Sequence, residues 1–334
     1  MKKVLFALTV AGLTLASCSN EDLPAPAPGG DGNVTFAVKL PAALSRADYG
    51  DGSVAKTLSY AVYDATDGSL VFASDDASTN APAATAVDAK NFTLSLSLVK
   101  GKSYDFIFWA DAATGSPYSF SSATKSVTAS YTGAVSNDEN RDAFFQSIAG
   151  LSVSGPMQQS VELRRPFAQL NVGTSDIAAA AAAKTVVKDV TVTVKGVYST
   201  LNLFSGIASD PKDVTFAATA MPGTAFTIDD VEYDYLAMDY LLTGTELEAE
   251  GNVQQAKREL MDASVLIAFT DGQSATVEVP NMPVQRNYRT NVYGALLTSP
   301  LDLTITVVPE FFEPDFNLEQ KVVKTAEELV AALA

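Results

Sequence analysis

The sequence predicts an all-β protein made of two β-sandwiches in series, and three observations support this prediction. Short segments in which apolar and polar residues alternate recur across residues 33–308. Turn-forming pairs such as Asp67-Gly68 and Pro222-Gly223 separate these segments. Only two windows have helical character. Many short strands with few helices are typical of sandwich folds.

The first predicted strand has the clearest pattern, because Val34, Phe36, Val38 and Leu40 alternate with smaller or polar residues. This period of two is typical of a strand with one buried face. Further strands of a first sandwich are predicted at 56–63, 69–73, 91–98, 102–110, 144–153 and 158–164. Those of a second sandwich are predicted at 167–173, 186–197, 200–204, 214–217, 233–240, 264–269, 276–279, 288–297 and 301–308. The break between the two is expected near Arg165-Pro166.

Two short helices are also expected. The window 176–184 contains six consecutive alanines, with Ser175 or Asp176 available as the N-cap. The window 325–334 begins with the capping-box spacing Thr325 to Glu328. Helices this short need a partner surface to be stable.

The N-terminus is typical of an exported lipoprotein. Lys2 and Lys3 precede an apolar run at 4–15 that is too short to span a bilayer, and Cys18 is the only cysteine. Residues 1–17 are therefore predicted to be a signal peptide and Cys18 a lipidated residue, although an ordinary signal peptide with a chance cysteine is the alternative. Residues 18–32 form a Pro/Gly-rich linker. Its acidic start at 19–22 suits a solvated spacer or resembles the export tag of Bacteroidota surface lipoproteins.

The composition excludes several classes of function. The chain has no histidine, and its cysteine is assigned to the lipid, so Ser-His-Asp and Cys-His catalysis and His- or Cys-based zinc sites are excluded. The formal net charge of −17 disfavours nucleic acid as a partner. No metal, cofactor or catalytic residue is predicted, and the protein is not expected to be an enzyme.

Four features suggest sites, but each has a simpler structural interpretation. Acidic clusters suit calcium or glycosidase chemistry only if they converge, and neither cluster has the Asp-x-Asp-x-Asn/Asp-Gly spacing of a calcium loop. Solvated turn carboxylates are therefore the preferred interpretation. Trp109 suits a sugar platform or a core residue, and Arg164-Arg165 suits a nucleic-acid or protease feature or a structural junction. The acidic clusters are Asp75-Asp76 and Asp229-Asp230 with Glu232 and Asp234.

A predicted loop follows the first strand and contains Arg46-Ala47. An arginine in an exposed loop is a typical site for a trypsin-like protease. Cleavage there would separate one strand, residues 34–40, from the rest of a finished sandwich.

Several motifs together resemble the fimbrillins, or type V pilins, of Bacteroidota. The likeness extends over most of residues 33–317 and is most specific at the domain junction and near the end. The motifs are the lipobox ending at Cys18, Phe108-Trp109-Ala110, the stretch 163–172 (LRRPFAQLNV), the stretch 283–294 (PVQRNYRTNVYG) and Leu296-Leu297-Thr298.

The resemblance implies two tandem transthyretin-like Greek-key β-sandwiches at 33–165 and 166–317, with a tail at 318–334. In fimbrillins an arginine-specific protease removes the first strand, and a strand from the next subunit fills the opened groove. Carried over here, cleavage falls between Arg46 and Ala47. The departing plug strand carries Val34, Phe36, Val38 and Leu40. The tail does not have the pattern expected of a strand donated to the next subunit, because its apolar and polar residues alternate poorly.

The leading hypothesis is therefore a fimbrial subunit anchored in the outer membrane by lipid and supporting adhesion at the cell surface. Expected partners are other fimbrial subunits and a host protein or glycan. The rival is a surface glycan-binding lipoprotein, in which aromatic side chains stack on sugars. A carboxylate-dependent hydrolase is the third alternative.

Overall fold

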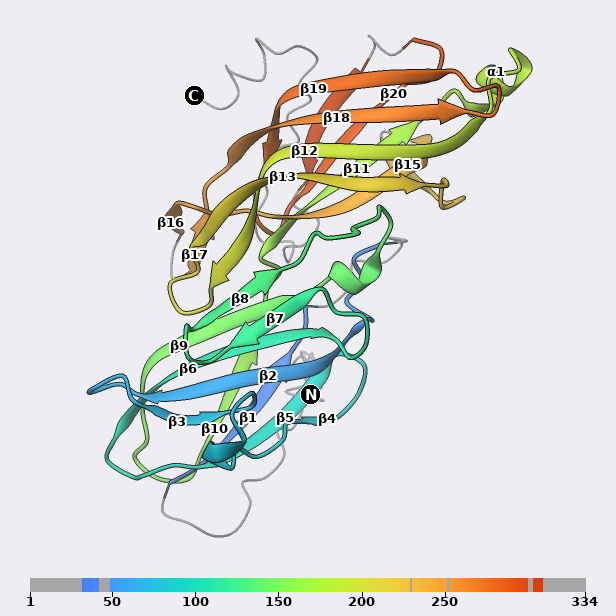
Figure 1. The fold of residues 1–334 in the computed structure, drawn as a ribbon. Coiled ribbons are helices and arrows are strands. Elements are labelled where there is room, and N and C mark those ends of the chain that lie inside the picture. The colour runs from blue at the N-terminus through green and yellow to red at the C-terminus, as the bar shows by residue number, and fades with distance from the viewer. Residues whose placement is uncertain (1–31, 42–48, 229, 251–252, 300–302, 309–334) are drawn as a thin grey trace, which may run out of the picture.

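The computed structural model describes residues 32–41, 49–228, 230–250, 253–299 and 303–308. Nearly all regular structure in these ranges is β, and Figure 1 shows two sandwiches stacked one above the other. The prediction of an all-β sandwich protein is confirmed. No helix in the described ranges is long and apolar enough to cross a membrane.

The first sandwich packs two four-stranded sheets against each other. The apolar cluster between them includes Phe36, Leu94, Phe106 and Phe108, all fully buried. One sheet has the order β10 (Met157–Glu162), β1 (Asn33–Lys39), β5 (Asn91–Ser97), β4 (Thr85–Ala86). The other has the order β3 (Leu70–Ala73), β2 (Ala55–Asp64), β6 (Ser103–Ala112), β9 (Phe144–Ser152).

The second sandwich is larger and encloses a core of valines, leucines and isoleucines from both of its sheets. One sheet has the order β14 (Ala225–Ile228), β15 (Val231–Leu242), β11 (Phe167–Thr174), β20 (Arg289–Gly294), β21 (Leu303–Val308). The other has the order β19 (Ser274–Val284), β18 (Glu259–Phe269), β12 (Val187–Asn202), β8 (Ser126–Ala129), β7 (Tyr118–Ser121), with β13 (Ala208–Thr219) also paired to β12. A separate hairpin joins β16 (Leu247–Glu250) to β17 (Val253–Ala256).

The hairpin β7–β8 connects the two halves of the molecule. By sequence it lies within 33–165, yet Thr128 of β8 pairs with Thr200 at the end of β12. A third apolar cluster lies where the halves meet and contains Trp109, Phe167 and Tyr240. Sheet residues of the first half thus have apolar neighbours on both faces, which explains why most of β6 is buried. The division at Arg165-Pro166 stays a prediction.

The alanine-rich helix is confirmed as α1 (Ile177–Ala182), but its capping differs from the prediction. Asp176 occupies the N-cap position without a side-chain cap hydrogen bond. Its carboxylate instead accepts hydrogen bonds from the backbone N–H and hydroxyl of Thr298, at 2.7 and 2.6 Å. Asp176 therefore fixes the chain after β20 rather than the helix start. The second predicted helix, at 325–334, lies outside the described residues.

Candidate functional site

Strand β1 lies inside its sheet rather than at an edge. It pairs antiparallel with β5, where Phe36 faces Leu94, and parallel with β10, where Phe36 faces Gln159. Both edges of β1 are therefore occupied by ladder hydrogen bonds. Removal of β1 alone would leave a slot bordered by two strands with unpaired backbone groups.

The apolar face of β1 reaches the centre of the first core. Val34, Phe36 and Val38 are completely buried, and Leu40, just after the strand, is 5% exposed. The Phe36 ring centroid lies 4.8 Å from that of Phe106 and 5.4 Å from that of Phe108. The structure thus brings together the four side chains that the sequence assigns to a plug strand.

The other predicted site residues lie outside the described part of the chain. They are Cys18, Arg46 and Ala47, together with the linker up to residue 31 and the tail at 318–334.

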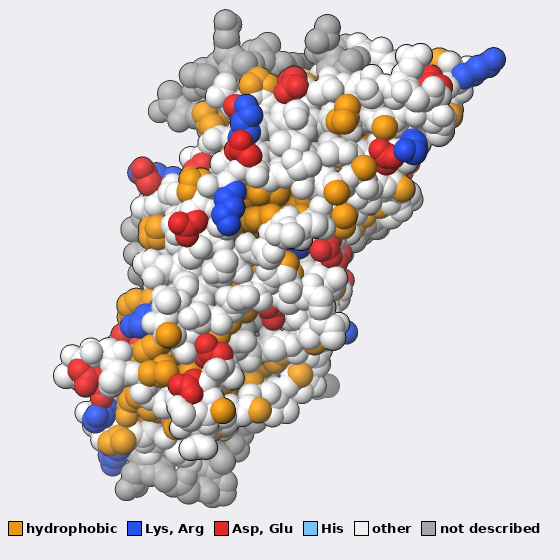
Figure 2. All heavy atoms as spheres, in the orientation of Figure 1, with side chains coloured by type: hydrophobic (Ala, Val, Ile, Leu, Met, Phe, Trp, Pro, Cys, Tyr) orange, Lys and Arg blue, Asp and Glu red, His pale blue; other side chains and the backbone are white. Residues whose placement is uncertain are grey.

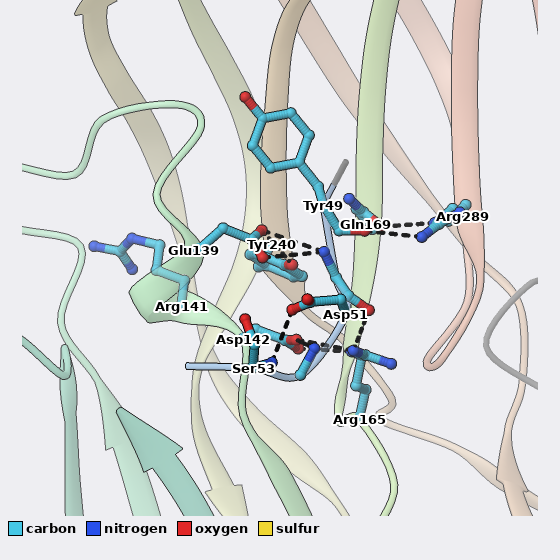
Figure 3. Close-up of polar contacts among 12 residues, drawn as sticks. Tyr49, Asp51, Ser53, Glu139, Arg141, Asp142, Arg165, Gln169, Tyr240 and Arg289 are labelled. Atoms are coloured by element: carbon cyan, nitrogen blue, oxygen red, sulfur yellow. Dashed lines mark hydrogen bonds and ion pairs between the residues drawn. The ribbon is translucent and has the colours of Figure 1, made fainter. Parts of the chain in front are cut away.

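Residues 49–53, called here the anchored segment, are held by polar groups from both halves (Figure 3). The Gly50 N–H donates to the two carboxylate oxygens of Glu139 at 3.1 and 3.3 Å. The Gly52 N–H donates to Asp142 Oδ2 at 3.2 Å.

Two arginines hold backbone carbonyls of the same segment. Arg289 Nη2 donates to the Tyr49 carbonyl at 2.9 Å, and Arg165 Nη2 donates to the Gly50 carbonyl. Arg289 lies on β20 of the second sandwich, and its Nε donates to Gln169 Oε1 on β11 at 2.8 Å. The first residues described after Arg46 are thus attached to the second half of the molecule as well as the first.

A buried ion pair forms the base of this arrangement. Arg165 Nε and Nη2 donate to the two oxygens of Asp142 at 2.6 and 2.8 Å, in a bidentate geometry. The Arg165 side chain is 4% exposed and that of Asp142 is fully buried. The Arg165 guanidinium also lies 4.5 Å from the ring centroid of Phe144. Loss of either partner of a pair this deeply buried leaves a desolvated charge, so both residues are needed for stability.

Glu139 is the electrostatically unusual group of the site. It belongs to the short 3-10 helix η2 (Glu139–Arg141), whose N-cap Asp138 accepts from the Asn140 N–H at 3.1 Å. Burial raises the pKa of Glu139 to about 7, and the neighbouring charge of Asp142 adds to this rise. The Tyr240 hydroxyl donates to Glu139 Oε1 at 2.8 Å and lowers the pKa in part. Glu139 therefore changes protonation near neutral pH while it contacts Gly50.

The sequence did not indicate this anchor, because residues 48–52 (DYGDG) have the composition of a flexible loop. The structure corrects that interpretation, because Tyr49 is only 8% exposed and the glycine N–H groups donate to buried carboxylates. Gly50 and Gly52 have φ values of 75° and 74°, which a glycine adopts without strain. The structural interpretation of Arg165 agrees with the buried ion pair. The two glycines that flank Asp51 were the only local sequence feature that pointed to a fixed backbone conformation here.

The remaining candidate features have ordinary structural roles. Trp109 is 1% exposed and packs edge-on against Tyr118 at a centroid distance of 5.1 Å, so it is a core residue. Asp76 caps a second 3-10 helix, η1 (Ala77–Thr79), and Glu232 is exposed. No cluster of three metal-binding side chains occurs within the described residues.

Comparisons with known proteins place the chain in a family without assigning its activity. No curated protein matches it. A Bacteroides thetaiotaomicron structure named for polysaccharide binding has 11% identity and a TM-score of 0.46, covering 89% of this chain and 99% of its own. A Bacteroides ovatus structure named as an adhesin has 14% identity and a TM-score of 0.45, covering 92% and 99%.

A fimbrial assembly protein from Parabacteroides distasonis has 13% identity and a TM-score of 0.41, covering 88% of this chain and 99% of its own. At these values the structural likeness says nothing about what this chain binds. The sequence match is firmer, since one family's sequence model aligns with residues 26–326. The chain belongs to that family, described as "Family of unknown function (DUF6562)".

Proposed function

We propose that this protein is a fimbrial subunit that assembles by exchange of strand β1 and supports adhesion at the cell surface. In this proposal Cys18 carries the lipid that attaches the subunit to the outer membrane. Cleavage after Arg46 then frees β1, and the protein works by assembly rather than by catalysis. The partners are other fimbrial subunits and a host protein or glycan.

The observation that supports this proposal best is the position of β1 between β5 and β10. Burial of its four large apolar side chains stabilises the strand by roughly 1.5–3 kcal/mol for each side chain. The same gain is available to any strand with equivalent side chains. An incoming strand on the same course must run antiparallel to β5 and parallel to β10, since the ladders on both sides set direction.

The anchored segment explains how the rest of the molecule would survive cleavage. A chain cut after Arg46 begins at Ala47, two residues before Tyr49. The contacts of Tyr49, Gly50 and Gly52 all lie on the retained side of the cut. Loss of β1 would therefore remove apolar packing without releasing the polar contacts between the two halves.

The test is digestion of the purified full-length protein with an arginine-specific protease. We expect a first cut after Arg46, identified by N-terminal sequencing, followed by oligomers in size-exclusion chromatography. Arg46→Ala should abolish both, whereas the control Arg258→Ala should cleave and assemble like the wild type. A product cut at Arg46 that stays monomeric and does not bind a synthetic peptide of residues 32–41 would overturn the proposal.

A further inference from the structure

A cavity of about 470 Å³ lies at the side of the first sandwich, and no residue of β1 or of the anchored segment lines it. It is lined by the first half of β2, the turn at Ser74-Asp75, the segment 81–86, Phe92 of β5 and Phe120 of β7. Pockets of 300–1,000 Å³ are typical of small-ligand sites. Nothing in the proposed assembly uses this cavity.

The cavity lies beside a part of the β2 edge that β3 does not cover. β3 pairs with Ala61 to Tyr63, and Ser74 closes the edge at Tyr60 by donating from its N–H to the Tyr60 carbonyl at 3.0 Å. Backbone groups alternate in direction along a strand, so those of Leu58 point to the same side as those of Tyr60. No described strand pairs with Leu58 on this side.

The side chains around the cavity combine hydroxyl groups, one carboxylate, one ammonium group and two aromatic rings, of which Phe92 is buried and Phe120 is partly exposed. Thr57 and Ser59 provide hydroxyls that make no hydrogen bond to any described residue. Asp75 is oriented by the Ser122 N–H, which donates to its Oδ2 at 2.9 Å. Ser122 follows Phe120 by two residues, so the β7–β8 hairpin positions the carboxylate and the ring together.

We propose that this cavity binds a neutral sugar, one or two residues of a glycan. Carboxylate and hydroxyl groups accept and donate to sugar hydroxyls, and an aromatic ring packs against the apolar face of a pyranose. The wall at 81–86 consists mainly of alanine, which leaves room for a ring. The two charged residues that line the site, Lys56 and Asp75, have opposite signs, so the site has no net charge.

The charge distribution favours a neutral ligand. Acidic and basic side chains are interspersed on the face shown in Figure 2, without a continuous basic surface. The net charge of −17 repels anionic polymers. An extended peptide fits less well, because a β-bulge between Ala55 and Thr57 breaks the ladder. Leu58 is then the one residue of the open β2 edge whose backbone could pair with such a peptide.

The test measures binding of cellobiose, maltose and lactose to the purified, uncleaved protein by saturation-transfer NMR. We expect at least one of the three to bind with a dissociation constant in the millimolar range or tighter. Phe120→Ala and Asp75→Asn should each weaken binding at least fivefold. Phe120→Tyr should retain binding, and Glu232→Gln should leave it unchanged as a charge-matched control. Thermal unfolding confirms that each variant is folded.

Three outcomes would overturn the inference. The first is that none of the three disaccharides binds. The second is that binding is insensitive to both Phe120→Ala and Asp75→Asn. The third is that acetyl-tetraalanine amide binds while the sugars do not, which would identify the open β2 edge as a peptide site. All of these use uncleaved protein, so they are independent of cleavage at Arg46 and of assembly.

Discussion

The chain is held in opposite ways on the two sides of residues 42–48. On the N-terminal side, β1 is retained by ladder hydrogen bonds and by apolar side chains such as Phe36. On the C-terminal side, the anchored segment is retained by carboxylates and guanidinium groups, including Asp142 and Arg165. The first kind of contact depends on shape and alternation, and the second on individual charged residues.

If β1 is exchanged as proposed, this difference explains why β1 can be replaced while the anchored segment stays in place. Another strand can reproduce ladder bonds and an apolar face, because neither depends on a unique side chain. A bidentate buried ion pair cannot be reproduced in that way, since each partner must be present and correctly placed. The comparison therefore predicts that variants in β1 and variants in the anchored segment weaken the molecule by distinct mechanisms.

The largest expected effect comes from Phe36→Ala in β1. Truncation of a fully buried phenylalanine typically lowers the free energy of unfolding by about 3–5 kcal/mol. Thr93→Ala on the neighbouring β5, opposite Ala37, is the control and should cost about 1 kcal/mol or less. Urea unfolding measures both. Equal losses for the two variants would mean that the apolar face of β1 does not hold the strand.

Arg165→Ala tests the charged side of the comparison. It leaves Asp142 buried without its partner, and we expect a loss of about 3–5 kcal/mol in the free energy of unfolding. Lys102→Ala is the matched control, because Lys102 Nζ also lies 2.6 Å from a carboxylate, Asp64, but its side chain is 52% exposed. That variant should lose about 0–1 kcal/mol.

The double variant Asp142→Ala/Arg165→Ala sharpens this result. Removal of both charges leaves no desolvated ion, so the double variant should be more stable than Arg165→Ala alone. A double variant that is less stable than Arg165→Ala would show that packing, rather than charge, dominates at this position.

A smaller effect is expected from Gly52→Ala in the anchored segment. Gly52 has a φ of 74°, and an added Cβ would lie 3.1 Å from Phe144 Cζ. Gly101→Ala is the control, since Gly101 has a φ of 86° but no atom within 4 Å of the added Cβ. Both carry the left-handed cost of roughly 1–2 kcal/mol. Gly52→Ala should show the larger fall in urea midpoint, and the reverse order would contradict tight packing of this segment.

The smallest expected change is a weaker pH dependence of the free energy of unfolding in Glu139→Gln. Because the folded-state pKa of about 7 lies above the ordinary value of 4.5, the folded protein binds more protons than the unfolded chain between these values. Wild-type stability should therefore fall as pH rises from 4.5 to 7. Glu139→Gln should make this fall shallower, and the remainder comes from Asp239, because burial raises the pKa of its carboxyl group to about 8. The exposed control Glu278→Gln should retain the full slope. An unchanged slope in Glu139→Gln would reject the role of Glu139.

The sequence predicted the elements that are regular by themselves. Strand β1 followed from strict alternation, and α1 from its alanine run. Strand β12 was predicted as two segments, 186–197 and 200–204, whereas pairing with β13 continues the ladder from Val197 through Tyr198 to Thr200. The short strands β7 and β8 were missed, since they form by pairing with each other and, for β8, with the distant strand β12.

The anchored segment could not be predicted for a related reason. Arg289 contacts Tyr49 across 240 residues of sequence, and Gly52 meets Asp142 across 90. Local patterns report periodicity and propensity, whereas these contacts arise only when the two halves pack together. The cavity beside Phe120 has the same origin, because β7 reaches it from the hairpin that joins the halves.

Hydrogen–deuterium exchange with mass spectrometry, before and after cleavage at Arg46, tests the central claim most directly. The account predicts that β5 and β10 lose protection once β1 departs, while the amides of Gly50 and Gly52 stay protected. Addition of a peptide of residues 32–41 should restore protection in β5 and β10. Loss of protection at Gly50 and Gly52 when β1 departs would contradict the account. It would show that β1 and the anchored segment are held as one unit.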